Sequence, residues 1–247
     1  MQGPSMELVV ALYQFAILLF SISVHQCAQA WMASRLGDHT ARLEGRISLN
    51  PTQHIDPFGT LLYPGLMIFG PLIGFTWFGN GSILMGWGKP TPIITRNLKK
   101  ITRDDNLITL AGPVGNLILV LAGMVLIVVL ALAMPAIMPA TAPGTTSSGE
   151  DNFSLLQSVP GALYLLGKLL IRVNLGLIFF NMLPVPPLDA SRILRNMLPY
   201  NALQTYDSIA RYGAILIFFL GSFLVQLFLP AGLTIVYTIL ALILRGH

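Results

Sequence analysis

Ser23-Val24-His25-Gln26-Cys27-Ala28-Gln29-Ala30-Trp31 closes an apolar run that begins near Leu8. The run is long enough for one membrane-spanning helix, since about 20 residues cross a bilayer. A histidine in that setting is costly, because a polar side chain inside a bilayer must find a partner or serve a purpose. A second polar stretch, Asn181-Met182-Leu183-Pro184-Val185-Pro186-Pro187-Leu188-Asp189, also follows an apolar run. Together the two stretches suggest a metal site embedded in the membrane.

The composition is that of a polytopic membrane protein. The chain has 247 residues, of which 54% are hydrophobic and 10% are charged, and its mean hydropathy is +0.73. Soluble domains carry about 25% charged residues, so this chain could not cover a water-facing surface. The net charge of +4 is modest and clustered, which indicates membrane topology and not nucleic-acid binding. The single cysteine, Cys27, excludes an intrachain disulfide.

Basic residues predict which end of each apolar segment faces the cytoplasm. Arg35, Arg42 and Arg46 follow the first apolar run, so the positive-inside rule places that end in the cytoplasm and the N-terminus outside. Residues 58–87 are apolar but broken by proline and glycine, and basic residues flank both ends. We therefore expect this segment to return to the side it left, as a re-entrant hairpin or a pair of short helices.

The remaining segments complete the predicted fold. Further apolar segments cover residues 106–134, 153–180, 206–229 and 232–244. Residues 41–50 alternate between apolar and polar side chains, which predicts a strand or hairpin. We predict an all-α polytopic membrane protein of about five to six membrane segments, with a small amphipathic β-hairpin and a re-entrant segment after the first helix. Residues 1–5 are typical of a tag or cloning remnant, and 6–247 form one membrane-embedded domain.

The spacing of His25 and Gln29 is that of a known type of metal site. Residues four apart share one helix face, one turn apart. In hydrolytic zinc sites two histidines have this spacing, and a glutamate beside the first activates the metal-bound water. Here the pattern is His-Gln-Cys-Ala-Gln, where His-Glu-x-x-His would be expected. Taken alone this is a weak signal, because a lone histidine on a helix is more often structural than a ligand.

Motifs in the same order along most of residues 6–198 give the chain a wider resemblance. It resembles the site-2 protease family, the intramembrane zinc metalloproteases, in its compact form without a PDZ domain. The segments that carry the resemblance are 23–38, Gly45-Arg46-Ile47-Ser48-Leu49-Asn50-Pro51, His54-Ile55-Asp56-Pro57-Phe58-Gly59, Gly86-Trp87-Gly88-Lys89-Pro90, Ala111-Gly112-Pro113, and 181–189.

The resemblance implies a function and assigns roles to residues. In the family two histidines and a distant aspartate bind zinc, and a glutamate acts as general base. Matched position by position, His25 is the first ligand, Gln29 stands at the second histidine, Asp189 is the third ligand, and Gln26 stands at the glutamate. The implied activity is a zinc metalloendopeptidase that cleaves substrate transmembrane helices near the cytoplasmic side, in a bacterial inner membrane. Its partners would be a transmembrane protein or peptide substrate and the lipid bilayer.

Three residues depart from the family pattern, all inside the site. Gln26 cannot accept a proton at neutral pH, so general-base catalysis is lost. Gln29 offers an amide, a poor zinc ligand compared with imidazole, and two remaining protein ligands make a weak site. Ala190 replaces a glycine and removes its conformational freedom. We predict that the chain does not hydrolyse peptides. Two explanations remain open: deliberate inactivation of an enzyme, and a natural pseudoprotease that binds transmembrane helices without cutting them.

Other polar residues have a functional and a structural interpretation. The resemblance suggests that Asn181 holds substrate backbone, whereas helix–helix hydrogen bonding is the alternative. His54 could reach the site as a supporting or substitute ligand, or could be a loop residue. Lys89 and Pro90 could present a backbone edge to an unwound substrate, or could form a plain cytoplasmic loop. Asn116 follows small residues that allow close helix contact, so it can bond across an interface.

The protease interpretation requires His25 and Asp189 to lie at one depth in the membrane. Two net crossings between them, at residues 106–134 and 153–180, satisfy this requirement, and a third crossing at 58–87 would not. A small transporter or channel is a further candidate. The sequence lacks the repeated halves and the paired broken helices that such proteins carry.

Overall fold

The computed structural model describes residues 6–75, 85–134, 155 and 157–245, with the side chains of residues 6, 7 and 222 excepted. The described part is helical and contains no β-strand. Short turns of helix are η1 (Pro51–Gln53), η2 (Pro57–Leu62), η3 (Pro71–Ile73) and η4 (Thr95–Asn97). The longer helices are α1 (Met6–Arg35), α2 (Thr40–Leu43), α3 (Tyr63–Phe69), α4 (Ile101–Ala133), α6 (Val159–Asn181), α7 (Asp189–Met197), α8 (Tyr200–Ala210) and α9 (Gly213–Arg245).

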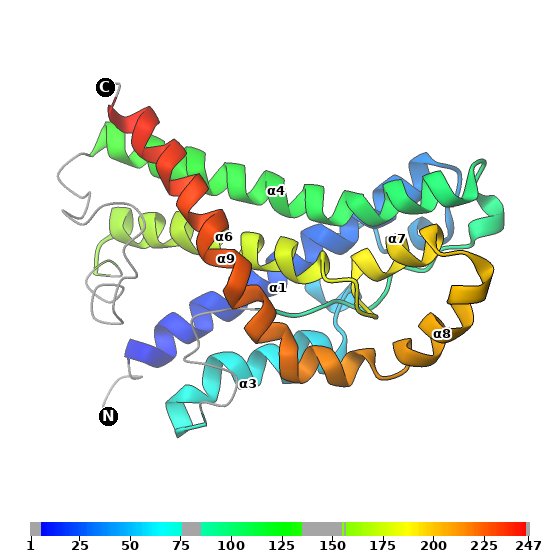
Figure 1. The fold of residues 1–247 in the computed structure, drawn as a ribbon. Helices are drawn as coiled ribbons and strands as arrows, with labels where there is room; N and C mark the ends of the chain where they lie inside the picture. Colours follow the sequence, from blue (N-terminus) through cyan, green and yellow to red (C-terminus); the bar gives the residue numbers. More distant parts are fainter. Residues whose placement is uncertain (1–5, 76–84, 135–154, 156, 246–247) are drawn as a thin grey trace.

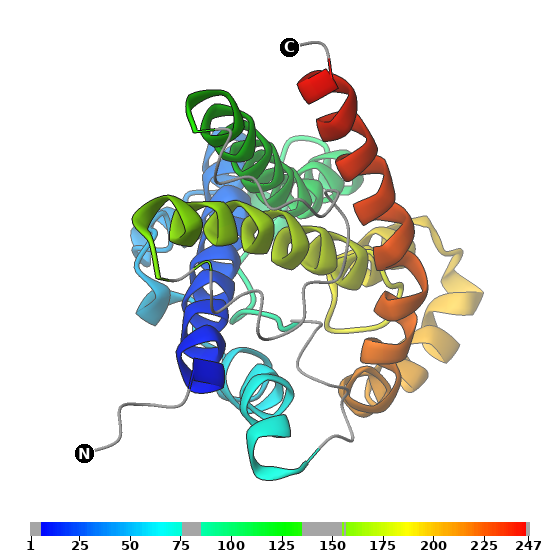
Figure 2. The same ribbon diagram turned by 90° about the vertical axis from the view of Figure 1, so that its left-hand side faces the viewer.

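Within the described residues, four helices are long and apolar enough to cross a membrane, and they lie in α1, α4, α6 and α9. The apolar helix at Pro57–Phe69 is too short to cross. The predicted membrane class is confirmed, while the number of spans is lower than the five to six expected. The start of α1 and the end of α9 lie at one end of the molecule, and α7 and α8 lie at the other (Figure 1). Helix α4 packs against both α1 and α6, and α9 packs against α6 (Figure 2).

The β-hairpin predicted for residues 41–50 is wrong. These residues begin in helix α2 and continue as a turn, in which Gly45 has φ of 72°. Their backbone bonds are local: Gly45 N donates to Arg42 O at 3.0 Å, and Arg46 N donates to Ala41 O at 2.9 Å. The alternating apolar residues Leu43 and Leu49 are 86% and 53% exposed. Alternation predicts a strand only where one face is buried, and the buried residues here, Ala41 and Arg46, do not include the alternating apolar residues.

The two separate segments predicted at 206–229 and 232–244 are also wrong. Helix α9 continues through Pro230 as one element. An interior proline removes one backbone hydrogen bond, and membrane helices tolerate this because hydroxyl side chains and neighbouring helices satisfy the freed groups. Pro230 carries no N–H, so the carbonyl that it frees is that of Gln226, one turn earlier, while the carbonyl of Pro230 itself accepts a hydrogen bond from Thr234 Oγ1 at 2.9 Å. The polar residues before Gly213 form the separate short helix α8.

The segment after α1 returns to its starting point, as the flanking charges predict. It enters through η2, α3 and η3 and is back beside η2 by Trp87. Trp87 N donates to Gly59 O at 3.1 Å, and Thr60 Oγ1 donates to Trp87 O at 2.8 Å. A Cβ at Gly59 would lie 2.3 Å from the Trp87 ring, so this close contact requires glycine. Residues 76–84 of the predicted re-entrant segment lie outside the described residues.

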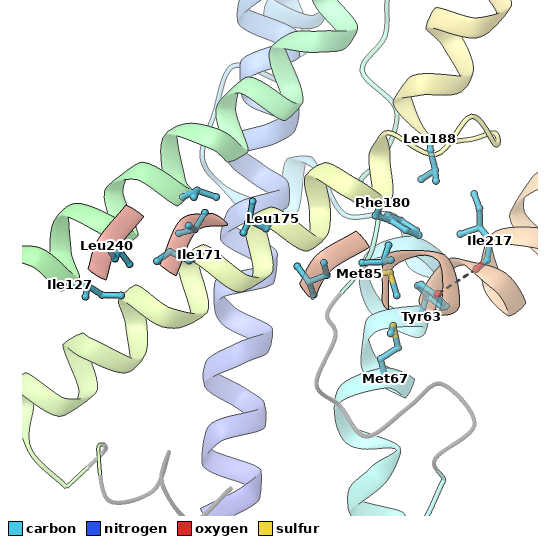
Figure 3. Packing of buried hydrophobic residues seen from close by; sticks show 14 of the residues in the cluster. Tyr63, Met67, Met85, Ile127, Ile171, Leu175, Phe180, Leu188, Ile217 and Leu240 are labelled. Atoms are coloured by element: carbon cyan, nitrogen blue, oxygen red, sulfur yellow. Dashed lines mark hydrogen bonds between the residues drawn. The ribbon is translucent and has the colours of Figure 1, made fainter. Parts of the chain in front are cut away.

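The largest buried cluster joins α3, α4, α6 and α9 (Figure 3). Tyr63 stacks on Phe180 with ring centroids 6.4 Å apart, and its hydroxyl donates to Ile217 O at 3.4 Å. Helices α4 and α6 cross closely at Gly123 and Gly167, where a Cβ on Gly123 would lie 2.8 Å from Gly167 O. Small residues permit such approach between membrane helices, where van der Waals packing drives association. This packing fixes the ends of α1 and α6, from which the polar residues project.

Candidate functional site

His25 and Asp189 meet inside the protein, as the interpretation requires. His25 lies on α1 and Asp189 is the first residue of α7. His25 Nε2 lies 2.8 Å from Asp189 Oδ2, and the two residues are 4% and 8% exposed. Asp189 Oδ2 has no hydrogen-bond partner among the described residues, so this is a close charge contact and not a well-aligned hydrogen bond. The imidazole and the carboxylate therefore share one buried site although they are far apart in the sequence.

The amide of Gln29 fills the space beside this pair. Gln29 Nε2 donates to Asp189 Oδ1 at 2.9 Å and to the backbone carbonyl of Thr109 at 3.3 Å. The same nitrogen lies 3.3 Å from His25 Nε2, one turn earlier on α1. Gln29 is 2% exposed. Its two N–H groups thus face Asp189 and Thr109, while its oxygen faces away from the carboxylate.

Gln26 is held by a hydroxyl that the sequence interpretation did not assign to the site. Thr91 Oγ1 donates to Gln26 Oε1 at 2.8 Å and lies 3.4 Å from Gln29 Oε1. Gln26 and Thr91 are 7% and 8% exposed. A single hydroxyl proton serves one acceptor at a time, so the shorter contact to Gln26 is the principal one. No motif marks Thr91, because its role arises only from the path of the returning loop.

The other side of His25 rests on α4. Asn116 Nδ2 lies 3.3 Å from His25 Nδ1, and Asn116 is fully buried. With the proton on Nε2, Nδ1 is free to accept from this amide. A Cβ at Gly112 would lie 2.3 Å from His25 Nε2, so only glycine leaves room for the ring. The small-residue motif predicted contact between helices, and the structure shows that the contact positions the histidine.

Asn181 ends α6, and Ala190 is the second residue of α7. Asn181 Nδ2 donates to Leu177 O of its own helix at 2.9 Å, and Asn181 is 6% exposed. This bond stays within α6, and the role of Asn181 in holding substrate backbone stays a prediction. Ala190 lies in the first turn of α7, where the backbone is helical, and no non-glycine residue in the described ranges has a positive φ. Alanine is therefore unstrained at this position.

His54, Lys89 and Pro90 belong to the wall next to the site. His54 Nε2 donates to Ser48 O at 2.8 Å, which turns the imidazole away from Asp189. Burial lowers the pKa of His54, and nearby Arg46 adds to this effect, while the bond to Ser48 opposes it. The backbone carbonyl of His54 accepts from Lys89 N at 2.8 Å. The side chains of Lys89 and Pro90 are exposed.

Asp38 fixes the loop that carries Thr91. Its carboxylate accepts from Ile94 N at 2.7 Å, Asn97 Nδ2 at 3.0 Å and Thr40 Oγ1 at 2.6 Å. Burial alone would raise the pKa of Asp38, but these hydrogen bonds outweigh it and lower the pKa. The ionised carboxylate therefore ties the loop to the end of α1.

Helix α7 is anchored so that Asp189 points at His25. Arg192 forms an ion pair with Asp105 of α4, and Asn196 Nδ2 donates to Asp105 Oδ2 at 2.7 Å. Both contacts lie on the side of α7 that packs against α4. Asp105 is 6% exposed, but the Arg192 side chain is 34% exposed, so this ion pair is only partly shielded from solvent. The pair holds the first turn of α7 beside α1.

The residues present do not fit a zinc ion. Two ligands of a tetrahedral zinc lie about 3.3 Å apart when metal–ligand distances are about 2.0–2.2 Å. His25 Nε2 and Asp189 Oδ2 are closer than this, at 2.8 Å. Gln29 presents N–H groups to the carboxylate, and an N–H group cannot coordinate a cation. In the parts of the chain that the structure describes, no group of three or more His, Cys, Asp or Glu side chains could hold a metal.

Comparison with known proteins identifies relatives along most of the chain. The chain is 33% identical over 226 residues to "Putative zinc metalloprotease YwhC" of Bacillus subtilis, which covers 89% of this chain and 87% of that protein. It is 31% identical over 101 residues to "Putative zinc metalloprotease Rip2" of Mycolicibacterium smegmatis, covering 41% of this chain and 34% of that protein. No family model and no solved structure matches. A similarity of this extent, together with the motifs around His25 and Asp189, shows that the chain belongs to the site-2 protease family.

Proposed function

We propose that the scaffold is that of an intramembrane metalloprotease, and that this chain does not carry out the hydrolysis. The family reaction is the cleavage of a substrate transmembrane helix near the cytoplasmic side of a bacterial inner membrane. The observation that carries the proposal is the amide of Gln29, whose Nε2 lies 2.9 Å from Asp189 Oδ1. A hydrogen-bond donor there satisfies the carboxylate without a cation.

Position 26 supports the same conclusion. A general base must accept a proton, and a carboxamide does not do so at neutral pH. The Gln26 oxygen already accepts a hydrogen bond from Thr91. The scaffold therefore lacks both the group that would move a proton and the second imidazole that would bind metal.

A second candidate function is a pseudoprotease that binds transmembrane helices. It is favoured by the way the altered residues are satisfied: Gln29 bonds to Asp189 and Thr109, and Gln26 bonds to Thr91. Buried polar groups are usually hydrogen-bonded, and in this site Asp189 Oδ2 and Asn116 Oδ1 have no hydrogen-bond partner among the described residues, whereas both glutamines are bonded. Here the two glutamines join one hydrogen-bonded cluster with their neighbours.

Restoring the family residues separates the two candidates. The double variant Gln26→Glu/Gln29→His is expressed with a model single-pass helix that carries glycine and proline near its cytoplasmic end. We expect the double variant to cleave this helix and the unaltered chain to leave it intact. Each single variant is expected to stay inactive, because hydrolysis needs both the base and the metal. Adding Asp189→Asn to the double variant should abolish cleavage.

The outcomes discriminate clearly. Cleavage by the double variant, sensitive to a zinc chelator, supports an inactivated protease. A folded double variant that binds the helix without cutting it supports the pseudoprotease. Metal-dependent cleavage by the unaltered chain contradicts the proposed loss of hydrolysis.

A further inference from the structure

Arg172 places a positively charged side chain near the middle of the membrane-spanning helix α6. Arg172 is thirteen residues from Val159 in α6, which places it about 20 Å along the helix at 1.5 Å per residue. The helix ends nine residues later at Asn181. Arg172 is therefore within about one turn of the midpoint of this span. Arginine stays protonated in proteins, so the position carries a permanent positive charge.

Arg172 is half-buried, and its charge is not fully compensated. Its Nε atom is buried and has no hydrogen-bond partner in the parts of the chain that are described. Among the described residues, Tyr237 of α9 is the group that interacts electrostatically with Arg172. A tyrosine hydroxyl can accept a hydrogen bond but is uncharged at neutral pH. Helix α9 thus provides a polar hydroxyl group for the guanidinium of Arg172, but it provides no negative charge.

The described acidic side chains of the helical bundle serve other partners. Helices α6 and α9 contain no aspartate or glutamate. Asp105 pairs with Arg192, Asp104 accepts from the backbone of Lys100, and Asp189 contacts His25 and Gln29. A charge within a bilayer is stable only when it is paired or faces a polar cavity. The counter-charge of Arg172 must come from elsewhere.

We propose that Arg172, next to Tyr237, binds a carboxylate side chain carried near the midpoint of a partner transmembrane helix. The partner would lie against the contact between α6 and α9 and would bring an aspartate or glutamate to the depth of the guanidinium. Opposite charges at one depth in hydrocarbon fix both the register and the choice of partner. This inference rests on the proposed function only in naming a helix as the partner, and it holds whether or not the helix is cut.

The depth favours a helix over a lipid headgroup. Phosphate groups lie outside the hydrocarbon core, which is about 30 Å thick, so a charge at the midpoint is about 15 Å from either boundary. A side chain on a crossing helix reaches the midpoint without deforming the bilayer. Glu150 and Asp151 precede α6 in the sequence, and their side chains are a third possible source that the experiment must include.

The experiment measures association in a bilayer. The full chain carries a fluorescent donor and is reconstituted in phosphatidylcholine vesicles. The probes are acceptor-labelled leucine–alanine helices of about 20 residues, with aspartate, asparagine or leucine at the midpoint. We expect the aspartate helix to bind about tenfold or more tightly than the asparagine helix. Arg172→Gln should remove this preference, and Arg172→Asp should bind a lysine helix instead. Arg245→Gln, at the far end of α9, is the matched control and should keep the preference.

Four results would overturn the inference. The first is equal binding of the three helices by the unaltered chain, and the second is retention of the preference in Arg172→Gln. The third is loss of the preference in Glu150→Gln/Asp151→Asn, because the partner would then be in the chain itself. The fourth is phosphatidylglycerol retained in detergent by the unaltered chain but not by Arg172→Gln.

Thermal unfolding of the chain without a partner helix adds a check. Arg172→Gln should melt at a higher temperature than the unaltered chain, and a lower melting temperature contradicts an unpaired charge. Lost helix binding with recovered proteolysis would leave the proposed function standing.

Discussion

At position 29 a side-chain amide stands where the family has an imidazole, and it does part of what a metal ion would do. A cation between His25 and Asp189 would neutralise the carboxylate and draw the two groups together. The Gln29 amide instead donates to Asp189, and His25 Nε2 lies 2.8 Å from the same carboxylate. Hydrogen bonds to a charged acceptor are stronger than neutral ones, so a buried carboxylate can be stabilised in this way. In this structure the Gln29 amide and the Asp189 carboxylate belong to one hydrogen-bonded cluster.

Metal binding should return with a single exchange. Gln29→His supplies a second imidazole on the same helix face and removes the N–H groups that face Asp189. We expect Gln29→His to retain about one zinc per chain after gel filtration, and the unaltered chain to retain almost none, as measured by elemental analysis. Gln26→Glu is the matched control, since it changes the neighbouring glutamine without adding a ligand. Zinc bound equally by the unaltered chain would contradict this account of the site.

His54 predicts a dependence of stability on pH. Burial, with a contribution from Arg46, lowers its pKa in the folded protein, below the value of about 6.5 expected when unfolded. The unfolded chain then binds more protons between these two pKa values, so stability falls as the pH drops below about 6.5. His54→Gln can keep the bond to Ser48 and cannot titrate.

The measurement compares the unfolding of the two proteins in detergent from pH 7.5 to 5, a range set by that pKa of about 6.5. We expect the free energy of unfolding of the unaltered chain to fall more steeply than that of His54→Gln as the pH falls. The difference in slope should correspond to the uptake of less than one proton on unfolding. Parallel curves would show that His54 binds protons equally in the folded and unfolded states.

At the scale of elements, the sequence predicts what depends on long apolar runs and flanking charge. It predicts the helices α1, α4 and α6, the return of the segment after α1, and the meeting of His25 with Asp189. The prediction from sequence is wrong where a local residue pattern is compatible with more than one structure. Alternation at 41–50 gave no strand because no neighbour pairs with it, and Pro230 did not end α9. The contacts of Thr91 with Gln26 and of Gly112 with His25 could not be predicted, because they join segments that are distant in the sequence.

The crossing of α4 and α6 supplies the next prediction. A Cβ at Gly123 would meet Gly167 O at 2.8 Å and Ile171 Cγ1 at 3.1 Å, so a larger residue must push the helices apart. We expect Gly123→Val to lower the free energy of unfolding by about 1–3 kcal/mol. Gly65→Ala is the matched control, because nothing lies within 4 Å of its Cβ position. Thermal unfolding in detergent measures both; equal melting temperatures would mean that the crossing is not tightly packed.

At the scale of the whole molecule, charge and crossings agree on one orientation. Apart from Lys168, Arg172 and Arg245, the lysines and arginines lie in or next to the segments that join α1 to α4 and α6 to α9. The positive-inside rule predicts that these segments face the cytoplasm, together with the His25–Asp189 end of the bundle. Four crossings then bring the end of α9 back to the side on which α1 begins, which is the arrangement in Figure 1.

This orientation predicts where the C-terminus lies. If α9 crosses once, a reporter fused after His247 lies outside the cytoplasm; two separate segments in place of α9 would leave it inside. We expect alkaline phosphatase fused there to be active and green fluorescent protein fused there to be dark, because the first folds only outside and the second only inside. The matched control is the same pair of reporters inserted after Arg211, before α9, where the pattern should reverse. An active phosphatase at both positions would remove α9 as a crossing, and with it the four-span arrangement that brings Asp189 to the cytoplasmic end of α1.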